Sequence, residues 1–341
     1  MTTMESVDAI PFKDLREQVE ELRERANALR RELRRYFVEK DELIDLMTIC
    51  LVAQEPLLFV GPPGTAKSEL VTKFCEALGL DGDDYFEYML TQFTEPSELL
   101  GPIDIGALKE GRYLRKTAGK LPVAKIAFLD EIFKSNSAIL NTLLTIINER
   151  KFYQDGRPRP VDLVMLYAAT NHVPEFTELG ALRDRFVLKA LSSSVRETHF
   201  DDLLALGVQN DLDRALNRKP WVGIADVNDF LKLRRYLDCV MAGIGDESRG
   251  EGGVRKDREQ FFPDAIFELF KRIIRTLNKE DGLFISDRKV VKLYRLIRAR
   301  ALIFHGGEVR KEDLVLLRYI GDRSEDLEHI REKVDDLLRV S

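Results

Sequence analysis

The chain contains few of the residues that build disulfide frameworks or zinc sites. Three cysteines, Cys50, Cys75 and Cys239, are scattered over 341 residues without a C-x-x-C spacing. The four histidines show no metal-ligand spacing either. Both a disulfide scaffold and a zinc site are therefore disfavoured, and the pattern is typical of a protein in a reducing compartment.

Long apolar runs and a large excess of one charge are also absent. No stretch approaches the ~20 apolar residues of a membrane span, and the polar N-terminus has no apolar signal core. The 53 basic and 59 acidic residues give a net charge of −6. This charge offers no overall attraction to nucleic acid but leaves a local basic patch open. We expect a soluble, cytoplasmic protein.

The 341 residues are enough for two domains and a small appendage, and the apolar residues, 44% of the chain, indicate sizeable cores. Between residues 57 and 190, short apolar runs alternate with helical segments, which predicts an α/β fold with a parallel sheet covered on both faces. After residue 192 the pattern becomes almost wholly helical. The five expected strands are Leu57–Val60, Tyr85–Leu90, Ile126–Leu129, Val164–Ala169 and Phe186–Leu188.

Residues 12–36 have the pattern of one charged helix with an apolar stripe. The stripe alternates spacings of four and three residues, which predicts packing on the following domain, with a coiled-coil partner as the alternative. Its arginines Arg30, Arg31, Arg34 and Arg35 are expected on a solvated face rather than in a nucleic-acid patch. The stripe consists of Leu15, Val19, Leu22, Ala26, Leu29, Leu33 and Tyr36.

Turn residues mark the connections between these elements. Asp155-Gly156, within residues 151–162, predicts the turn of a β-hairpin. The Gly- and charge-rich stretch from Gly243 to Lys256 predicts an exposed loop. The expected domains are an N-terminal amphipathic helix in 1–38, an αβα core in 39–192, a helical domain in 193–320 and a C-terminal helix in 321–341.

The most informative segment lies between the first apolar run and a helical stretch that starts at Glu69. Strand, glycine-rich loop and helix form the context of a phosphate-binding loop, in which backbone N–H groups and the helix N-terminus cradle an anion. Lys67 is expected to neutralise the β- and γ-phosphates, and the Ser68 hydroxyl to bind Mg²⁺. The segment consists of Gly61, Pro62, Pro63, Gly64, Thr65, Ala66, Lys67 and Ser68.

One position of this segment departs from the G-x-x-x-x-G-K-[ST] pattern. Ala66 stands where the second glycine is expected. Alanine is tolerable there only if φ is negative, because a Cβ atom is penalised at positive φ. An ordinary Gly/Pro turn between strand and helix is the alternative interpretation of the segment.

Two acids, Asp130 and Glu131, directly follow the expected strand at 126–129. Strand C-termini of α/β sheets face the ligand crevice. We expect Asp130 to hold Mg²⁺ through water and Glu131 to orient and activate an attacking water. The alternative is an acidic helix start, which suits the helix dipole. The position about sixty residues after the phosphate-binding loop favours the site.

Three further polar residues are candidates with open alternatives. Asn171, at the tip of the fourth strand, is placed to hydrogen-bond the γ-phosphate or the water, or else is a turn residue. Arg183 and Arg185 flank Asp184 before the fifth strand. Either arginine could complete a neighbouring subunit's site as an arginine finger. A salt bridge with Asp184 or simple solvation is the alternative.

Taken in this order, the motifs resemble those of an AAA+ ATPase, and more narrowly those of the MoxR family and its RavA-like branch. The resemblance covers roughly residues 35–320, and Ala66 is in keeping with it. Further supporting strings are FTEPSELLGP at 93–102, FLDEIFK at 128–134, AILNTLLTIINER at 138–150 and SDR at 286–288.

The resemblance implies an AAA+ αβα core with a five-stranded parallel sheet, preceded by an N-terminal helix and followed by an all-α lid domain. It also implies ATP hydrolysis that depends on Mg²⁺. The residues that match are the Walker A segment 61–68 with the adjoining Glu69, the Walker B pair Asp130 and Glu131, sensor 1 Asn171, arginine finger Arg185 with Arg183 as alternative, and sensor 2 Arg288.

The resemblance also implies partners. The family forms hexameric rings that remodel or mature protein clients, commonly with a partner that bears a von Willebrand factor A domain. Residues 101–121 resemble the family's helix-2 insert and residues 151–162 its hairpin before sensor 1, two loops that engage substrates. RavA carries a further domain beyond its lid, whereas this chain stops soon after the lid, so RavA's own partner is not carried over.

Two other functions stay open at this point. A nucleic-acid motor or effector is suggested by the Arg-rich N-terminal helix and the basic residues between 109 and 120, although net acidity and the lack of a nucleic-acid module argue against it. A slow, nucleotide-gated scaffold is the other alternative.

Overall fold

The computed structural model describes residues 7, 9–174, 179–244 and 258–340, and these residues form two compact units. Unit 1 comprises residues up to 55, residues 77–79 and residues from 195 onward; unit 2 comprises residues 56–76 and 80–194. Unit 1 thus holds the expected N-terminal helix, lid and C-terminal helix together. The expected domain limits at 38, 192 and 320 stay predictions. Most of the expected loop at 243–256 lies outside the described residues.

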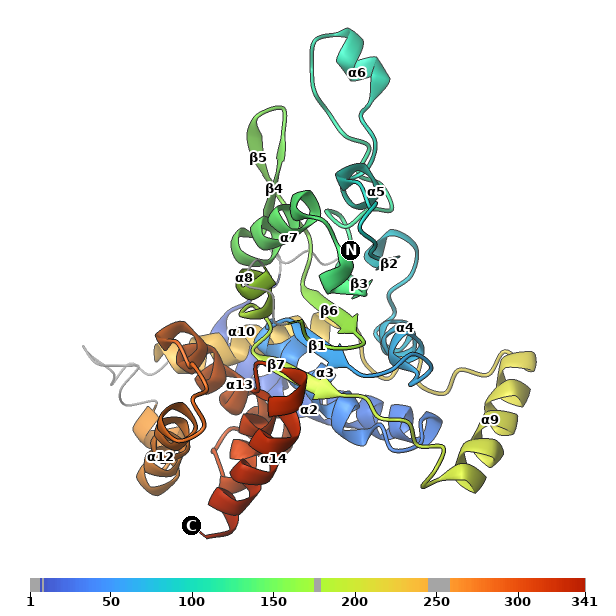
Figure 1. The fold of residues 1–341 in the computed structure, drawn as a ribbon. Helices are drawn as coiled ribbons and strands as arrows, with labels where there is room; N and C mark the ends of the chain where they lie inside the picture. Colours follow the sequence, from blue (N-terminus) through green and yellow to red (C-terminus); the bar gives the residue numbers. More distant parts are fainter. Residues whose placement is uncertain (1–6, 8, 175–178, 245–257, 341) are drawn as a thin grey trace. The chain divides into compact units, whose positions relative to one another are not determined.

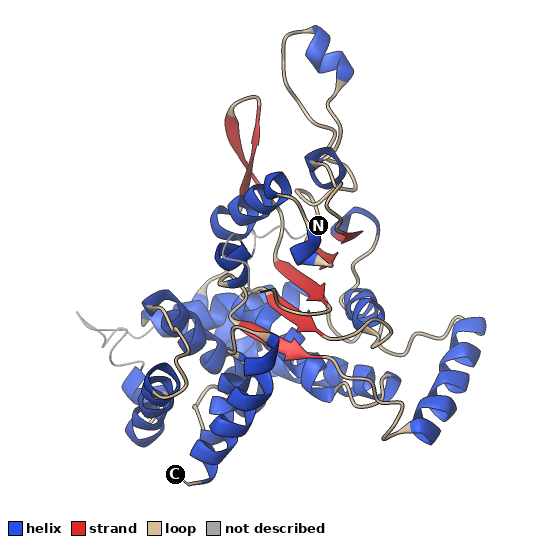
Figure 2. Ribbon diagram, viewed as in Figure 1, coloured by secondary structure: helices blue, strands red, loops and turns tan. Residues whose placement is uncertain are grey.

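Unit 2 is built on one parallel sheet with the strand order β2-β3-β6-β1-β7 (Figures 1 and 2). Every residue of β1 is buried. Strands β6 and β7 flank it on both edges, and the helices that return the chain between parallel strands cover the faces of such a sheet. The α/β fold with five parallel strands is therefore confirmed. The strands are β1 Leu57–Val60, β2 Tyr85–Met89, β3 Ile126–Asp130, β6 Met165–Thr170 and β7 Leu188–Leu191.

The fifth strand begins later than expected. The apolar run at 186–188 suggested a strand there, but Phe186 and Val187 are buried outside β7, which starts at Leu188. Lys189 interrupts the apolar pattern and still lies in the strand, where its Nζ donates to Phe186 O at 3.1 Å. The long aliphatic stem and this hydrogen bond let a charged side chain sit in a buried strand.

Helices and short 3₁₀ turns connect the strands of unit 2. The crossover from β1 to β2 contains α4, and the crossover from β3 to β6 contains α7. The elements are α4 Lys67–Ala77, η1 Gly82–Asp84, α5 Pro96–Leu100, α6 Ile105–Lys109, η2 Ile132–Lys134, α7 Ser137–Glu149 and α8 Gly180–Arg183.

Two excursions leave the sheet between these elements, and Figure 1 shows both projecting beyond it. The first is the segment 101–121, which contains α6 and a β-bridge between Ile103 and Arg115. The second is the expected hairpin, β4 Lys151–Gln154 and β5 Arg157–Pro160, which is confirmed. Its turn residues Asp155 and Gly156 both have positive φ, as a type I′ turn requires.

Unit 1 is helical. The N-terminal helix α2 packs on α10, α3 and α13, and its whole apolar stripe is buried. The prediction that the stripe packs on the following domain is confirmed only in part, because α3 lies in the expected 39–192 domain whereas α10 and α13 lie in the expected 193–320 domain. One of the helical segments, η4, is a 3₁₀ helix. The elements are α2 Phe12–Tyr36, α3 Asp41–Ala53, α9 Phe200–Ala215, α10 Val227–Ala242, α12 Asp264–Lys279, α13 Asp287–His305, η4 Lys311–Tyr319 and α14 Ser324–Arg339.

The arginines of α2 are not all solvated, which corrects the expectation from the sequence. Arg30 is 6% exposed and donates from Nη2 to Asp45 Oδ1 of α3 at 2.6 Å, and Arg34 donates to the same oxygen at 2.5 Å. Burial lowers the pKa of Arg30, and Asp45 opposes that change. Two of the four arginines, Arg30 and Arg34, thus hold α2 against α3. This weakens the case for a nucleic-acid patch on α2.

Candidate active site

The phosphate-binding loop candidate connects β1 to α4 and is held by backbone contacts. Gly61 N donates to Thr170 O of β6 at 3.1 Å, and Ser192 N, just after β7, donates to Val60 O at 2.8 Å. Ser192 Oγ also donates to Thr65 O at 3.1 Å. The loop is therefore fixed on both sides by the strands that flank β1.

Gly61 is required by the close approach of the chain that follows β7. A Cβ atom at this position would lie 2.2 Å from Ser192 O, which is far inside van der Waals contact. Backbone atoms cannot move aside as a flexible side chain could. The first glycine of the motif thus permits the loop to pass beside residue 192.

Ala66 has φ 61, so the condition set for alanine at this position, a negative φ, is not met. The residue adopts the left-handed conformation that the usual glycine would adopt, at a cost of about 1–2 kcal/mol for an L-residue. Gly64, with φ 80, is left-handed as well. Such strain is stored where surrounding contacts fix the backbone, as the neighbours of this loop do.

Lys67, the first residue of α4, is buried at 8% exposure and folds back over the loop. Its Nζ donates to Gly61 O at 2.7 Å and to Pro62 O at 2.8 Å. Burial lowers the pKa of Lys67, and the charges of Asp130 and Glu131 partly offset that shift. The ammonium group therefore lies within electrostatic reach of both acids.

The acid pair occupies the carboxyl end of β3 and the turn after it. Asp130 ends the strand, and its Oδ1 accepts a hydrogen bond from Glu131 N at 2.8 Å. Glu131 has φ 53, so it too is a non-glycine residue in the left-handed region. This strained turn directs the backbone away from β3 and into the 3₁₀ turn η2.

The Glu131 carboxylate is held by two donors on the same oxygen. Asn171 Nδ2, just beyond the end of β6, donates to Glu131 Oε1 at 2.7 Å. Lys134 Nζ, in η2, donates to the same atom at 2.9 Å. The structure thus brings together Lys67, Asp130, Glu131 and Asn171 at the carboxyl ends of three adjacent strands, β3, β6 and β1.

The two arginines before β7 are engaged within unit 2. Arg183 Nη1 donates to Pro174 O at 3.0 Å. Arg185 Nη1 lies 3.7 Å from Asp184 Oδ2. The buried Nε of Arg185 has no hydrogen-bond partner among the described residues. Neither arginine contacts the Lys67–Glu131 cluster through any bond recorded for the described chain. The salt-bridge alternative for Arg185 is supported in part, because its ion pair with Asp184 is present but long.

The remaining candidates lie on helix starts. Ser68 and Glu69 are exposed residues in the first turn of α4. Arg288 is the exposed second residue of α13 and belongs to unit 1, whereas the cluster belongs to unit 2. Ser286 caps α13 by accepting from Lys289 N at 3.2 Å. The role of Arg288 stays a prediction.

The oxygen donors near the loop fit a magnesium ion that is shared with a phosphate. Asp130 uses Oδ1 for the backbone contact, so Oδ2 is the carboxylate oxygen left for a cation, and Ser68 supplies a hydroxyl. Among the described residues there is no group of three or more His, Cys, Asp or Glu side chains placed to hold a metal. Magnesium bound through one or two protein oxygens plus substrate phosphates needs no such group.

Two residues that contact the site, Lys134 and Ser192, were not singled out from the sequence. Lys134 follows Glu131 at the i+3 spacing of a helical turn, so its position relative to the acid was a usable signal. Ser192 lies 127 residues from Thr65, and nothing in the sequence pattern indicated that contact.

Family models match most of the chain. Residues 24–232 match the MoxR domain in the MoxR-vWA-beta-propeller ternary systems, and residues 265–334 match an AAA lid domain. The first match covers more than half of the 341 residues and includes Lys67, Asp130, Glu131 and Asn171.

Individual proteins show the same likeness. Uncharacterized protein MJ0812 of Methanocaldococcus jannaschii is 35% identical over 294 residues, which is 86% of this chain and 70% of that protein. Chaperone MoxR1 of Mycobacterium tuberculosis is 27% identical over 162 residues, 46% of this chain and 41% of that protein. A crystal structure from Cytophaga hutchinsonii ATCC 33406, provisionally designated an ATPase, has a TM-score of 0.66 at 19% identity. It covers 96% of this chain and 97% of its own, and shows the shared fold.

Hydropathy of the helices gives one further finding. None of the helices in the described part of the chain has the length and apolar character needed to cross a bilayer.

Proposed function

This chain belongs to the MoxR family of AAA+ proteins, and from that premise we propose that it hydrolyses ATP to remodel or mature a protein client. The observation that carries the proposal is the cluster at the ends of β1, β3 and β6. It groups a buried lysine, two carboxylates and an amide beside a loop with backbone N–H groups. Such a set serves phosphoryl transfer to water, in which positioning and charge stabilisation supply most of the catalysis.

In the proposed reaction, the N–H groups of residues 61–68 and the ammonium of Lys67 bind the β- and γ-phosphates. To do so, Lys67 exchanges its bonds to Gly61 O and Pro62 O for phosphate oxygens. Glu131 orients a water molecule toward the γ-phosphorus and accepts its proton. Asn171 holds the Glu131 carboxylate in place and is itself within reach of that water.

The proposal includes a requirement for Mg²⁺. Ser68 and Asp130 are the residues that would hold the ion, the latter through water. When bound, Mg²⁺ neutralises part of the phosphate charge that develops during transfer. The residues of the chain keep their own tasks, since Lys67 binds phosphate and Glu131 positions water.

We place the site between subunits of a homo-oligomer, with a hexameric ring as the proposed form. In this arrangement Arg185 of one subunit reaches the γ-phosphate held by its neighbour, with Arg183 as the alternative. Arg288, on the lid, contacts the same phosphate and couples the lid to the nucleotide state. The long pair with Asp184 and the unsatisfied Nε make Arg185 the easier of the two arginines to release.

The proposed partners are a protein client and a protein with a von Willebrand factor A domain, in the cytoplasm. The family model that matches residues 24–232 is itself described from MoxR-vWA-beta-propeller systems, which supports such a partner. The excursions at 101–121 and 151–160 are the proposed client surface. They are tied to each other, because Tyr113 N donates to Asp155 Oδ1 at 3.1 Å. Assignment to the RavA-like branch stays a prediction.

The first test is Glu131→Gln, which keeps the shape and hydrogen-bonding capacity of the side chain but removes its basicity. We expect ATP binding to persist and turnover to fall at least ~100-fold. Equilibrium binding of a fluorescent ATP analogue and phosphate release with Mg²⁺ give the two readouts. Glu110→Gln, at an exposed ion pair with Arg112 in unit 2, is the matched control and should turn over normally. Undiminished hydrolysis by Glu131→Gln would refute the assigned role.

The second test addresses the shared site. Arg185→Ala should bind ATP normally and lose ~10³-fold or more in rate, as arginine-finger variants do. Lys67→Ala should lose ATP binding. A mixture of the two inactive variants contains interfaces with an intact loop and an intact arginine, so activity should return. If subunit exchange is shown by mixed labels and activity stays absent, Arg185 does not act in trans.

A further inference from the structure

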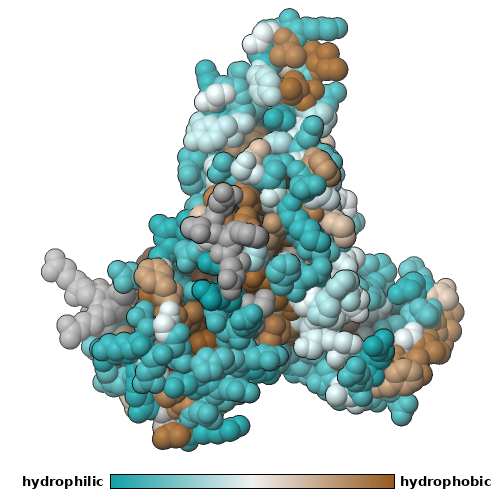
Figure 3. All heavy atoms as spheres, in the orientation of Figure 1, coloured by the Kyte–Doolittle hydropathy of each residue, from teal (hydrophilic) through white to brown (hydrophobic). Residues whose placement is uncertain are grey.

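Helix α9, residues Phe200–Ala215, presents an apolar face to solvent. Its apolar residues recur every four positions, and Val208 is 72% exposed. No residue of the helix is buried. Figure 3 shows the resulting hydrophobic surface at the place that α9 occupies in Figure 1. We call this face the α9 ridge, which consists of Phe200, Leu204, Val208, Leu212 and Leu216.

The other side of α9 faces the rest of unit 1. Leu206, Asn210 and Asp213 are the residues on it that are partly covered. Asn210 Nδ2 donates to Tyr36 O at 3.1 Å, which ties the helix to the end of α2. The arrangement leaves the apolar face outward, opposite to the usual amphipathic helix. An exposed apolar face of this kind marks an interaction surface.

The α9 ridge is flanked by acids. Asp201 and Asp211 lie on the same side of the helix as Leu204 and Val208, by the 100° advance per residue. Asp211 pairs with Arg214 at 3.2 Å, and both side chains are mostly exposed. An exposed pair of this kind contributes little, so Asp211 is free to exchange it for a better-buried cation. The partner of the ridge should therefore combine apolar surface with positive charge.

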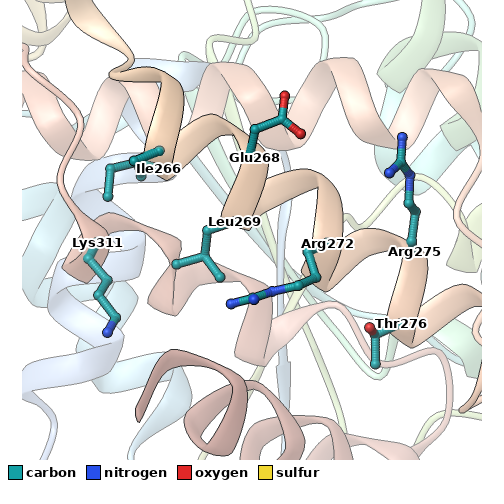
Figure 4. Close-up of a pocket in the computed structure, with 8 residues that line it drawn as sticks. Ile266, Glu268, Leu269, Arg272, Arg275, Thr276 and Lys311 are labelled. Carbon is teal, nitrogen blue, oxygen red and sulfur yellow. The ribbon is translucent and has the colours of Figure 1, made fainter. Parts of the chain in front are cut away.

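Unit 1 itself carries such a surface at α12. A cavity of about 660 Å³ lies along this helix and reaches Lys311 in η4. In Figure 4 the side chains of Leu269, Arg272 and Lys311 point toward one common space, and Glu268 and Arg275 line the same cavity. We call this cavity the α12 groove. It is lined by Ala265, Ile266, Glu268, Leu269, Arg272, Arg275, Thr276 and Lys311.

We propose that the α9 ridge of one copy of this chain docks into the α12 groove of a second copy. Val208 and Leu212 would cover Ile266 and Leu269, and Asp211 would meet Arg272 and Lys311. The groove volume is of the size that holds a few side chains. The two surfaces differ, so the contact is heterologous and repeats from copy to copy, which generates a ring or a filament.

Charge complementarity discriminates among the possible binding partners of the α9 ridge. Pairing α9 with α9 of another copy would place acids opposite acids, which disfavours a symmetric contact. An anionic membrane surface attracts basic segments, and the acids of the ridge lack that attraction. The groove offers three cations, Arg272, Arg275 and Lys311, against one acid, Glu268, together with apolar lining residues. The inference extends the homo-oligomer of the proposed function but does not depend on ATP hydrolysis.

The test reverses one charge on each surface. Asp211→Arg and Arg272→Glu should each weaken self-association of the full chain at least ~30-fold, measured by sedimentation velocity over a concentration series with and without Mg·ATP. An equimolar mixture of the two variants contains one reversed pair and one native pair, so assembly should return. The double variant should assemble by itself. Asp202→Arg, off the ridge, and Lys279→Glu, at the exposed end of α12 outside the groove lining, are the matched controls.

Four outcomes overturn the proposal: unchanged assembly of either single variant, loss of assembly without rescue in the mixture, equal loss in the controls, and a wild-type chain that stays monomeric throughout. Binding of a fluorescent ATP analogue by each variant is measured in parallel. Retained binding by a variant that no longer assembles separates failure of this interface from failure of the nucleotide site. Val208→Glu, at a 72% exposed position, gives an independent check of the apolar contact.

Discussion

The loop after β1 and the turn after β3 meet in one cluster but are built differently. The loop is fixed by backbone atoms, since Gly61, Val60 and Thr65 all bond to residues 170 and 192 through their main chain. The turn is fixed by side chains, since Asp130, Asn171 and Lys134 hold Glu131. Each segment also contains one non-glycine residue at positive φ, Ala66 or Glu131.

This difference separates binding from chemistry. A main-chain cradle presents N–H groups whatever the side chains are. Apart from loss of the Lys67 ammonium, only changes that move the backbone should therefore damage phosphate binding. A carboxylate that is aimed by side-chain donors depends on each donor, so single substitutions should alter the rate and leave binding intact. Substitutions in the two segments should therefore give different phenotypes, and four variants test this.

Gly61→Ala should have the largest effect. Its Cβ would meet Ser192 O at 2.2 Å, so the loop or the chain after β7 must shift. We expect a loss of about 3 kcal/mol in the free energy of unfolding and loss of nucleotide binding. Urea unfolding and binding of a fluorescent ATP analogue measure these effects. Gly64→Ala, where no atom lies within 4 Å of the added Cβ, should cost only about 1 kcal/mol, from its positive φ.

Asn171→Ala should lower turnover ~10- to 100-fold, because Glu131 loses the donor at 2.7 Å that aims its carboxylate. ATP affinity should change less than ~3-fold if binding belongs to the other segment. Steady-state phosphate release and equilibrium binding separate the two quantities. A variant that loses affinity as much as rate would show that Asn171 contacts the nucleotide in the ground state and that the division between the segments is too simple.

Lys134→Met should have a smaller effect of the same kind. The Lys134 side chain is 58% exposed, so its pair with Glu131 is screened, and we expect a ~3- to 10-fold fall in turnover with unchanged affinity. Lys134→Arg should restore most of the rate, since a guanidinium can donate to the same oxygen. Rescue by arginine distinguishes a donor to Glu131 from a residue that only packs in η2.

Ala66→Gly should have the smallest effect and the opposite sign. Glycine removes the penalty of a Cβ at φ 61 but adds freedom to the unfolded chain, so a net stabilisation of about 0.5 kcal/mol is expected. Thermal unfolding should shift upward by a few degrees or less, and turnover should stay within ~2-fold. A lower unfolding temperature would mean that the methyl group makes a contact worth more than the strain.

The sequence predicted the elements better than their contacts. The apolar runs located all five strands, and Asp155-Gly156 located the hairpin turn, because local patterning and turn chemistry act over a few residues. The pattern misplaced the start of β7, because the apolar Phe186 and Val187 are buried before the strand begins and Lys189 lies within it. It also placed Arg30 in solvent, although a carboxylate on the next helix covers it.

By itself, the sequence determined which residues carry the candidate chemistry, since glycine, lysine, acid and amide stand at strand ends where a parallel sheet must gather them. Only the tertiary structure decided how they meet. The left-handed Ala66, the approach of Ser192 to Gly61 and the two donors on Glu131 depend on neighbouring strands that are distant in sequence. The exposure of the apolar face of α9 was likewise decided by the tertiary structure. An apolar spacing of four residues predicts that a face will be covered, but not whether the cover belongs to the same chain.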